Sequence, residues 1–279
     1  MHINRLSKNY QTRMSNLKHR YTPHYCAFHA LRAILVKIPK TASTSVSTHM
    51  FMCDYEKSNL LWGTWAEPGQ SYKHSAIMEI KKLCKGRQFS DYYKISFVRN
   101  PWDWFFSYYR HFKRSSHTAR TNLVHQMFSK NPHDFPEFGE YIRRMEEAIL
   151  AGVNDKRQDM HKHEANPLMP QYKYLVDRDE KLLVDFVGKY EKLQTDWHKI
   201  CRELVIDNNM WKKRGSNLTI DDVLQLPRLN ESRDNRVTID GSRDGALVKK
   251  HYRECYTDEE AEIVYNLYRK DIEMFNYEF

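Results

Sequence analysis

Two segments of this chain run from a buried apolar strand through a short turn directly into a helix. Residues 33–38 predict a short buried strand, residues 39–44 a polar turn, and residues 45–53 a helix. Residues 93–98 predict a second strand, which a helix over 101–113 follows. Two such alternations predict an α/β fold in which helices flank a central parallel sheet.

The second of these helices has several start signals in its first residues. Asn100 can cap the helix, Pro101 suits its first position, and Asp103 can complete a capping box. A third strand is predicted at 182–187, and another helix at 191–205. The sequence therefore predicts three strands that share one sheet.

The remaining segments are expected to pack around this sheet as one domain over residues 1–279. Residues 1–25 form a basic arm, and residues 115–169 are polar and broken by prolines, which predicts an insertion with one helix at 138–150. Near the end, Thr257 with Glu260 forms a capping box. The apolar residues after it have helical spacing and predict a docked helix: Val264, Leu267, Tyr268, Ile272 and Phe275.

The net charge of +9 is concentrated at the start of the chain, where no Asp or Glu precedes Asp54. Such a field attracts anions, and a nucleic acid, a polyanionic glycan or a phosphorylated cofactor would each satisfy it. No apolar run approaches the roughly 20 residues of a membrane span, and no signal-peptide core is visible. The cysteines are widely spaced without a CxxC pair, so we expect a cytoplasmic protein without a membrane span.

The turn at residues 39–44 has the character of an anion site. A tight turn that leads into a helix presents unpaired N–H groups and the positive end of the helix dipole. A Walker A loop requires glycines, and this turn has none. An atypical P-loop nucleotide kinase and a basic nucleic-acid-binding protein remain alternatives at this point.

Two motifs resemble those of a known family. The segment Lys37–Ser45 resembles the 5'-phosphosulfate loop of sulfotransferases that use 3'-phosphoadenosine 5'-phosphosulfate (PAPS), especially heparan sulfate 2-O-sulfotransferases. The segment Ile95–Tyr109 resembles the family's 3'-phosphate motif, an Arg after a strand and a Ser eight positions later. Segments 171–175, 184–191, 226–233 and 268–277 look like the carbohydrate branch that includes chondroitin sulfotransferases.

The resemblance implies a single P-loop-like domain that transfers a sulfuryl group from PAPS to an acceptor hydroxyl, of a glycan in this branch. The nucleotide product would be PAP, no metal would take part, and no nucleic acid is expected as a partner. Acceptor contacts are expected in the helical insertion at 115–169. The implied cofactor-binding residues are Lys37, Lys40, Thr41, Ala42, Ser43, Thr44, Ser45, Arg99, Ser107, Asn230, Ser232 and Arg233.

Two residues are the expected catalytic groups. By the resemblance, Lys40 stabilises the leaving phosphate, an electrostatic effect that can contribute roughly 10²–10³ in rate. His74 is the expected general base, because the family places a base His between its two phosphate motifs and an imidazole suits that task. Glu67 and Glu79 are the alternative bases in the same interval.

Overall fold

The computed structural model describes most of the α/β core and leaves out several connecting segments. The described residues are 26–28, 31–47, 49–50, 74–84, 88–115, 135–151, 169–204 and 251–279. The predicted basic arm at 1–25 lies outside these ranges, as do most of the predicted insertion and residues 205–250.

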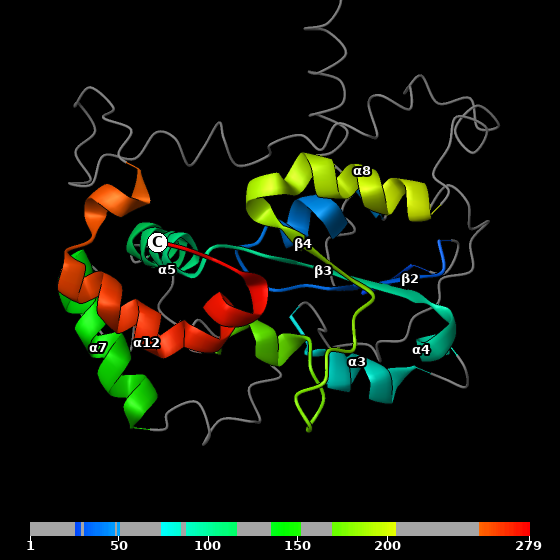
Figure 1. Cartoon of the computed structure of the whole chain (residues 1–279), viewed down its shortest axis with the longest axis horizontal. Coiled ribbons are helices and arrows are strands. Elements are labelled where there is room, and N and C mark those ends of the chain that lie inside the picture. The colour runs from blue at the N-terminus through cyan, green and yellow to red at the C-terminus, as the bar shows by residue number, and fades with distance from the viewer. Residues whose placement is uncertain are drawn as a thin grey trace, which may run out of the picture.

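A four-stranded sheet in the order β1-β2-β3-β4 forms the centre of the protein (Figure 1). The strands are β1 (Ala27–Phe28), β2 (Ala33–Val36), β3 (Tyr93–Val98) and β4 (Phe186–Lys189). β2, β3 and β4 are parallel, which confirms the predicted parallel core. β1 pairs antiparallel with β2, so the sheet is mixed, a feature that the sequence did not reveal.

The third parallel strand exists, but its predicted bounds at 182–187 are wrong. Leu182 forms an isolated antiparallel bridge with Val176, because the chain turns back on itself between them. The Asp177 carboxylate closes that turn by accepting hydrogen bonds from two N–H groups that follow it. The chain joins β3 only from Phe186 onward, so the strand runs to Lys189.

Helices cover both faces of the sheet (Figure 1). On one face lies α8 (Leu193–Glu203), together with the helical residues 43–47 and 49–50. On the other lie α3 (Ile77–Leu83) and α4 (Gln88–Asp91). Side chains of β2 alternate between the two faces, as a strand requires, and all of them are buried. Two separate hydrophobic clusters result, one on each face of the sheet.

An aromatic-rich group of helices stands at one end of the sheet. It consists of α5 (Pro101–Ser115), α7 (Phe138–Leu150) and α12 (Asp258–Phe275). All three begin where the sequence predicted, and Thr257 with Glu260 forms the expected capping box of α12. The residues predicted for the buried side of α5 are buried: Trp102, Phe105, Phe106 and Tyr109. The rings of Phe105, Phe106 and Tyr109 pack against Phe138, Tyr141 and Tyr268, and the ring of Trp102 packs against Phe279.

Short 3₁₀ helices connect these layers. They are η3 (Gln171–Tyr174), η4 (Tyr190–Lys192) and η5 (Tyr252–Cys255). The helix predicted at 191–205 is therefore η4 followed by α8, which ends at Glu203. Within the described ranges, every helix is too short or too polar to cross a lipid bilayer.

Candidate active site

The carboxyl ends of the parallel strands β2, β3 and β4 meet at one edge of the sheet. β2 leads into the turn at 37–42, β3 into Arg99 and Asn100, and β4 into η4. Open α/β sheets bind their ligands at this edge, because the turns and helix starts there present free backbone groups. The two sequence motifs therefore lie next to one another, as the resemblance implied.

The turn after β2 has its carbonyl groups held by side chains. Each carbonyl from Val36 to Lys40 accepts a hydrogen bond at 2.8–3.1 Å, and the donors in chain order are Ser96, His74, Thr41, Trp104 and Arg99. A carbonyl and the following N–H belong to one planar peptide unit, so a fixed carbonyl also fixes the direction of that N–H. The N–H groups of Lys37, Ile38, Lys40 and Thr41 are therefore oriented before any ligand binds.

Two residues of the turn adopt left-handed backbone conformations although neither is a glycine. The φ angle is 65° at Lys40 and 62° at Ala42. Alternation between left- and right-handed residues turns successive N–H groups toward one concavity, which is an anion-binding arrangement. The helix that follows begins at Ser43, where the N–H of Val46 donates to the carbonyl of Ala42. Its first N–H groups and its dipole add to the attraction for an anion.

The predicted contact residues of the turn differ in what they can offer. The Thr41 hydroxyl is buried and donates to the carbonyl of Ile38, so it serves the turn itself. Ser43 and Ser45 are buried, whereas Ala42, Thr44 and Lys40 are partly exposed. Lys37 is only 2% exposed. Its charge acts on Cys26, where burial raises the thiol pKa and Lys37 lowers it by a smaller amount.

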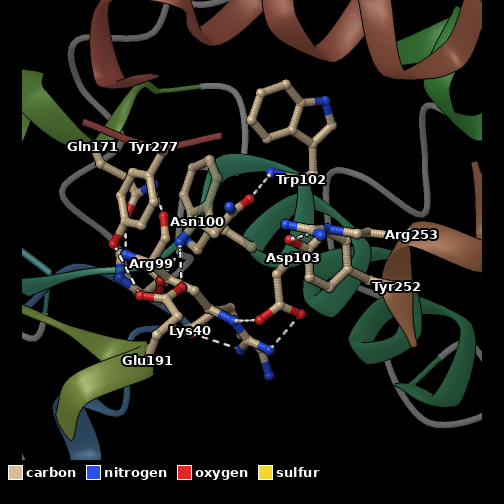
Figure 2. Close-up of polar contacts among 12 residues, drawn as sticks. Lys40, Arg99, Asn100, Trp102, Asp103, Gln171, Glu191, Tyr252, Arg253 and Tyr277 are labelled. Carbon is tan, nitrogen blue, oxygen red and sulfur yellow. Dashed lines mark hydrogen bonds and ion pairs between the residues drawn. The ribbon is translucent and has the colours of Figure 1, made fainter. Parts of the chain in front are cut away.

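Arg99 lies where the two motifs meet (Figure 2). Its Nε and Nη2 donate to the two oxygens of Asp103 at 2.8 and 2.9 Å, and its Nη1 donates to the carbonyl of Lys40 at 3.1 Å. The guanidinium also stacks 4.1 Å from the ring centroid of Tyr190. Burial lowers the pKa of Arg99, but Asp103, Tyr190 and Glu191 together raise it by more, so the net pKa lies above the usual value. Arg99 is therefore a fixed cation at the edge of the turn.

The start of α5 is held differently from the prediction. Asn100 caps the helix as expected, since its Oδ1 accepts from the N–H of Trp102 at 3.1 Å. The predicted capping box is wrong, because the N–H of Asn100 donates to Glu191 at 2.7 Å and Asp103 pairs with Arg99. A bidentate pair with an arginine is stronger than one hydrogen bond to a neutral N–H. Asp103 therefore pairs with Arg99 and does not accept from the N–H of Asn100.

Ser107 lies on the same stripe of α5 as Asp103. Positions four apart in a helix share a face, so Arg99, Asp103 and Ser107 follow one another along one side. Ser107 is partly exposed, unlike its neighbours Phe106 and Tyr108. The hydroxyl can therefore reach a ligand that Arg99 also contacts, although Asp103 stands between them.

This combination of an anion-binding turn and an arginine at adjacent strand ends agrees with a comparison against protein-family models. The model described as the sulfotransferase family matches residues 7–278. The chain belongs to this family. Searches of curated proteins and of solved structures found no match for this sulfotransferase. Its class of reaction is therefore sulfuryl transfer, carried out on an α/β fold.

The predicted base of the sulfotransferase lies against the turn. His74 Nδ1 is 2.8 Å from the carbonyl of Lys37. A carbonyl only accepts, so Nδ1 carries the proton and the lone pair of the neutral ring is on Nε2. Glu79, an alternative base, accepts a hydrogen bond from the N–H of Ala76 at 3.1 Å at the start of α3. Glu67, Asn230, Ser232 and Arg233 lie outside the described residues.

The structure adds residues that the sequence did not single out. Gln171 pairs with the backbone of Arg99, and Glu191 with that of Asn100 (Figure 2). The chain end also takes part, since Tyr277 donates to Glu191 at 3.1 Å and Asn100 Nδ2 donates to the carbonyl of Glu278 at 2.8 Å. Gln171 and Glu191 lie in segments that resembled the family, but nothing local in the sequence indicated their partners.

Among the described residues, no group of three or more His, Cys, Asp or Glu side chains could hold a metal ion. Positive groups at this edge of the sheet include Lys37, Lys40, Arg99, Lys189 and the N-terminus of the helix that begins at Ser43.

Proposed function

We propose that this sulfotransferase transfers the sulfuryl group of PAPS to a hydroxyl of an acceptor, and that the acceptor is a carbohydrate. The observation that carries the donor assignment is the link between the turn and Arg99, whose Nη1 donates to the carbonyl of Lys40. A 5'-phosphosulfate and a 3'-phosphate belong to one nucleotide, so their binding groups must lie side by side. The carbohydrate assignment rests on the resemblance of residues 39–45 to enzymes of that branch.

The residues present fit such a donor. The N–H groups of Lys40 and Thr41, oriented by the held carbonyls before them, and those of residues 42–44 at the helix start would bind the 5'-phosphosulfate, together with the Lys40 ammonium. The guanidinium of Arg99 and the hydroxyl of Ser107 would bind the 3'-phosphate. Three N–H groups of Arg99 have partners in the structure, and a guanidinium carries five, so it can accept a further anion without losing Asp103.

The reaction needs a positive group near the leaving phosphate and a base near the attacking hydroxyl. PAPS supplies an activated sulfuryl group whose leaving group is the 5'-phosphate of PAP. Lys40 would stabilise the negative charge that grows on that phosphate. His74 would accept the acceptor's proton at Nε2, because its Nδ1 proton is held by the carbonyl of Lys37.

The donor assignment predicts that the protein distinguishes two nucleotides that differ at the 3' position. PAP should raise the melting temperature much more than ADP at equal concentration, because ADP has no group for Arg99 and Ser107. A thermal-shift titration with both nucleotides measures this difference. Equal shifts would contradict the PAPS assignment and favour an atypical nucleotide kinase.

The 3'-phosphate site predicts a selective loss in Arg99→Ala. PAP affinity should fall by about 1.5–3 kcal/mol, the range for hydrogen bonds to charged groups, and ADP affinity should change much less. Isothermal titration measures both affinities. Arg269→Ala is the matched control, because Arg269 is exposed on α12, where it donates to Asn266 and lies over the ring of Tyr265.

The base assignment predicts that His74→Ala separates turnover from nucleotide binding. PAP affinity should stay near that of the wild type, whereas kcat should fall by roughly 10²–10⁴, as expected for loss of a general base. The wild-type rate should also fall at acid pH, since a protonated imidazole accepts no proton. His198→Ala is the control, because His198 is exposed on α8. Wild-type turnover in His74→Ala would move the base role to Glu67 or Glu79.

The acceptor class can be tested directly by following sulfate incorporation from labelled PAPS. Desulfated glycosaminoglycans, a tyrosine peptide and a simple alcohol present the same nucleophile in different surroundings. Preferential labelling of the glycans supports the carbohydrate proposal. Preferential labelling of the peptide or the alcohol overturns it while leaving sulfuryl transfer intact.

A further inference from the structure

Arg99 is held by its backbone as well as by its side chain. Gln171 is completely buried, and its amide group pairs with both backbone groups of Arg99 (Figure 2). The N–H of Arg99 donates to Gln171 Oε1 at 2.9 Å, and Gln171 Nε2 donates to the carbonyl of Arg99 at 2.8 Å. The amide thus continues the pattern of a neighbouring strand by one residue past the end of β3, where Val98 is the last residue to pair with β4.

Gln171 is itself fixed by a carboxylate from the far end of the chain. Asp271 on α12 is completely buried. Its Oδ2 accepts from the N–H of Gln171 at 2.8 Å, and its Oδ1 accepts from the N–H of Tyr172 at 2.7 Å. A buried carboxylate is costly unless hydrogen bonds satisfy it, and here the bonds come from two adjacent backbone groups at the start of η3. The position of η3 is thereby tied to α12.

These contacts form one continuous chain of hydrogen bonds from α12 through η3 to the end of β3. A forked guanidinium binds a phosphate well only when its plane and distance are right, and small displacements of the backbone move the fork. The ion pair with Asp103 restrains the side chain of Arg99, but both residues lie on the same helix start and would move together. Gln171 is an anchor from outside this helix start that holds both backbone groups of Arg99, whereas Glu191 and the carbonyl of Glu278 hold the next residue, Asn100.

We propose that Gln171 and Asp271 are positioning residues that set Arg99 for recognition of the nucleotide 3'-phosphate. This inference rests on the proposed use of PAPS. It assigns to two fully buried residues a role in ligand selectivity rather than in folding alone. Substitution of Gln171 or Asp271 should therefore weaken binding of the 3'-phosphate and leave binding of the rest of the nucleotide unchanged.

The test compares PAP and ADP affinities in Gln171→Met, which keeps the side-chain volume and removes both hydrogen bonds to Arg99. We expect PAP affinity to fall about tenfold, equivalent to about 1.4 kcal/mol, with ADP affinity changed less than about twofold. In an Arg99→Ala background the same substitution should have no further effect on PAP affinity, because the group it positions is gone.

Two controls separate positioning from loss of stability. Met145→Ala removes a buried side chain of α7 that does not touch Arg99, and it should lower the melting temperature with an unchanged PAP to ADP ratio. Gln194→Met on the exposed side of α8 should change neither. If Gln171→Met does not fold, Asp271→Asn replaces it, since an amide keeps one acceptor and opposes the second N–H. The ratio of PAP affinity to ADP affinity in Asp271→Asn should lie between the ratios of the wild type and Arg99→Ala.

The outcomes distinguish the inference from the function on which it rests. A wild-type protein that binds PAP no better than ADP overturns the PAPS proposal and the inference with it. A wild type that prefers PAP, with the same preference in Gln171→Met or in Asp271→Asn, overturns the inference alone. A loss of PAP affinity that is equally large in the Arg99→Ala background also overturns it.

Discussion

At the scale of single residues, the turn after β2, the proposed site of the 5'-phosphosulfate, is built without the glycines that usually permit such a backbone. Ala42 has a φ of 62°, a conformation that costs an L-residue roughly 1–2 kcal/mol. Side chains from β3, α5 and the start of α3 hold the neighbouring carbonyls and keep the turn in this shape. The strain is therefore maintained by the surrounding structure.

The left-handed conformation predicts that Ala42→Gly stabilises the protein by about 1 kcal/mol, because glycine adopts this φ without a steric cost. Urea unfolding should show a higher midpoint with an unchanged slope. Ala76→Gly is the matched control, since Ala76 has a φ of −68° and the same substitution there should destabilise. A lower urea midpoint for Ala42→Gly than for the wild type would contradict the conclusion that the backbone at Ala42 is strained.

Residues in contiguous motifs were predictable, and residues that act across the fold were not. Lys40 and Arg99 stand beside a strand, a turn and a helix start that the sequence reveals locally. Gln171 reaches Arg99 over a separation of 72 residues, and no pattern in the sequence encodes that contact. Asp103 was misassigned because a capping box is a local rule, whereas the partner that it prefers is a nearby charge.

At the scale of secondary structure, β4 is the predicted strand whose bounds the sequence placed least well. Its Gly188 gives no strand signal, yet it lies opposite Phe97 of β3 in the register of the sheet. A Cβ at Gly188 would come within 2.5 Å of the Phe97 ring. Glycine is therefore required at this position by packing, not by its backbone. The helices were predicted better because caps and apolar spacing mark α5, α7 and α12 within their own residues.

The close approach predicts that Gly188→Ala destabilises the protein by about 1–3 kcal/mol, the cost of an added methyl in a packed core. Thermal or urea unfolding measures the change. Phe97→Leu should partly relieve the clash, so the double variant should be less destabilised than the sum of the single ones. Strict additivity would indicate that the alanine is accommodated without contact between the two positions.

At the scale of the whole molecule, two buried ionisable groups give opposing pH dependences of stability. Burial raises the pKa of Asp271 from 3.8 to about 7 against the effect of its two N–H partners. Burial lowers the pKa of His49 from 6.5 to about 4 against its hydrogen bond to Ser45. Between pH 3.8 and about 7, Asp271 holds a proton in the folded protein that it has lost in the unfolded chain. Between about pH 4 and 6.5, His49 lacks a proton in the folded protein that it holds in the unfolded chain.

These pKa shifts predict that two variants differ from the wild type in opposite ways as pH changes, when the free energy of unfolding is compared. The contribution of Asp271 falls as pH rises from about 4 to 7, so Asp271→Asn should gain stability relative to the wild type over that interval. The contribution of His49 rises from about pH 4 to 6.5, so His49→Phe should lose stability relative to the wild type. Each slope is at most about 1.4 kcal/mol per pH unit. Urea unfolding across this range measures both, and slopes of the same sign would contradict the assignment.

The hydrogen bonds that complete the site join residues far apart in the order of synthesis. The side chain of Asn100 donates to the carbonyl of Glu278, and the N–H of Gln171 donates to the carboxylate of Asp271. A ribosome releases β3 and α5 well before α12, so Trp104 and Phe105 of α5 lack their aromatic partner Tyr268 in the growing chain. Such intermediates aggregate readily and are typical clients of chaperones. Nucleotide binding should therefore appear only in chains that contain the segment from Asp271 to Glu278.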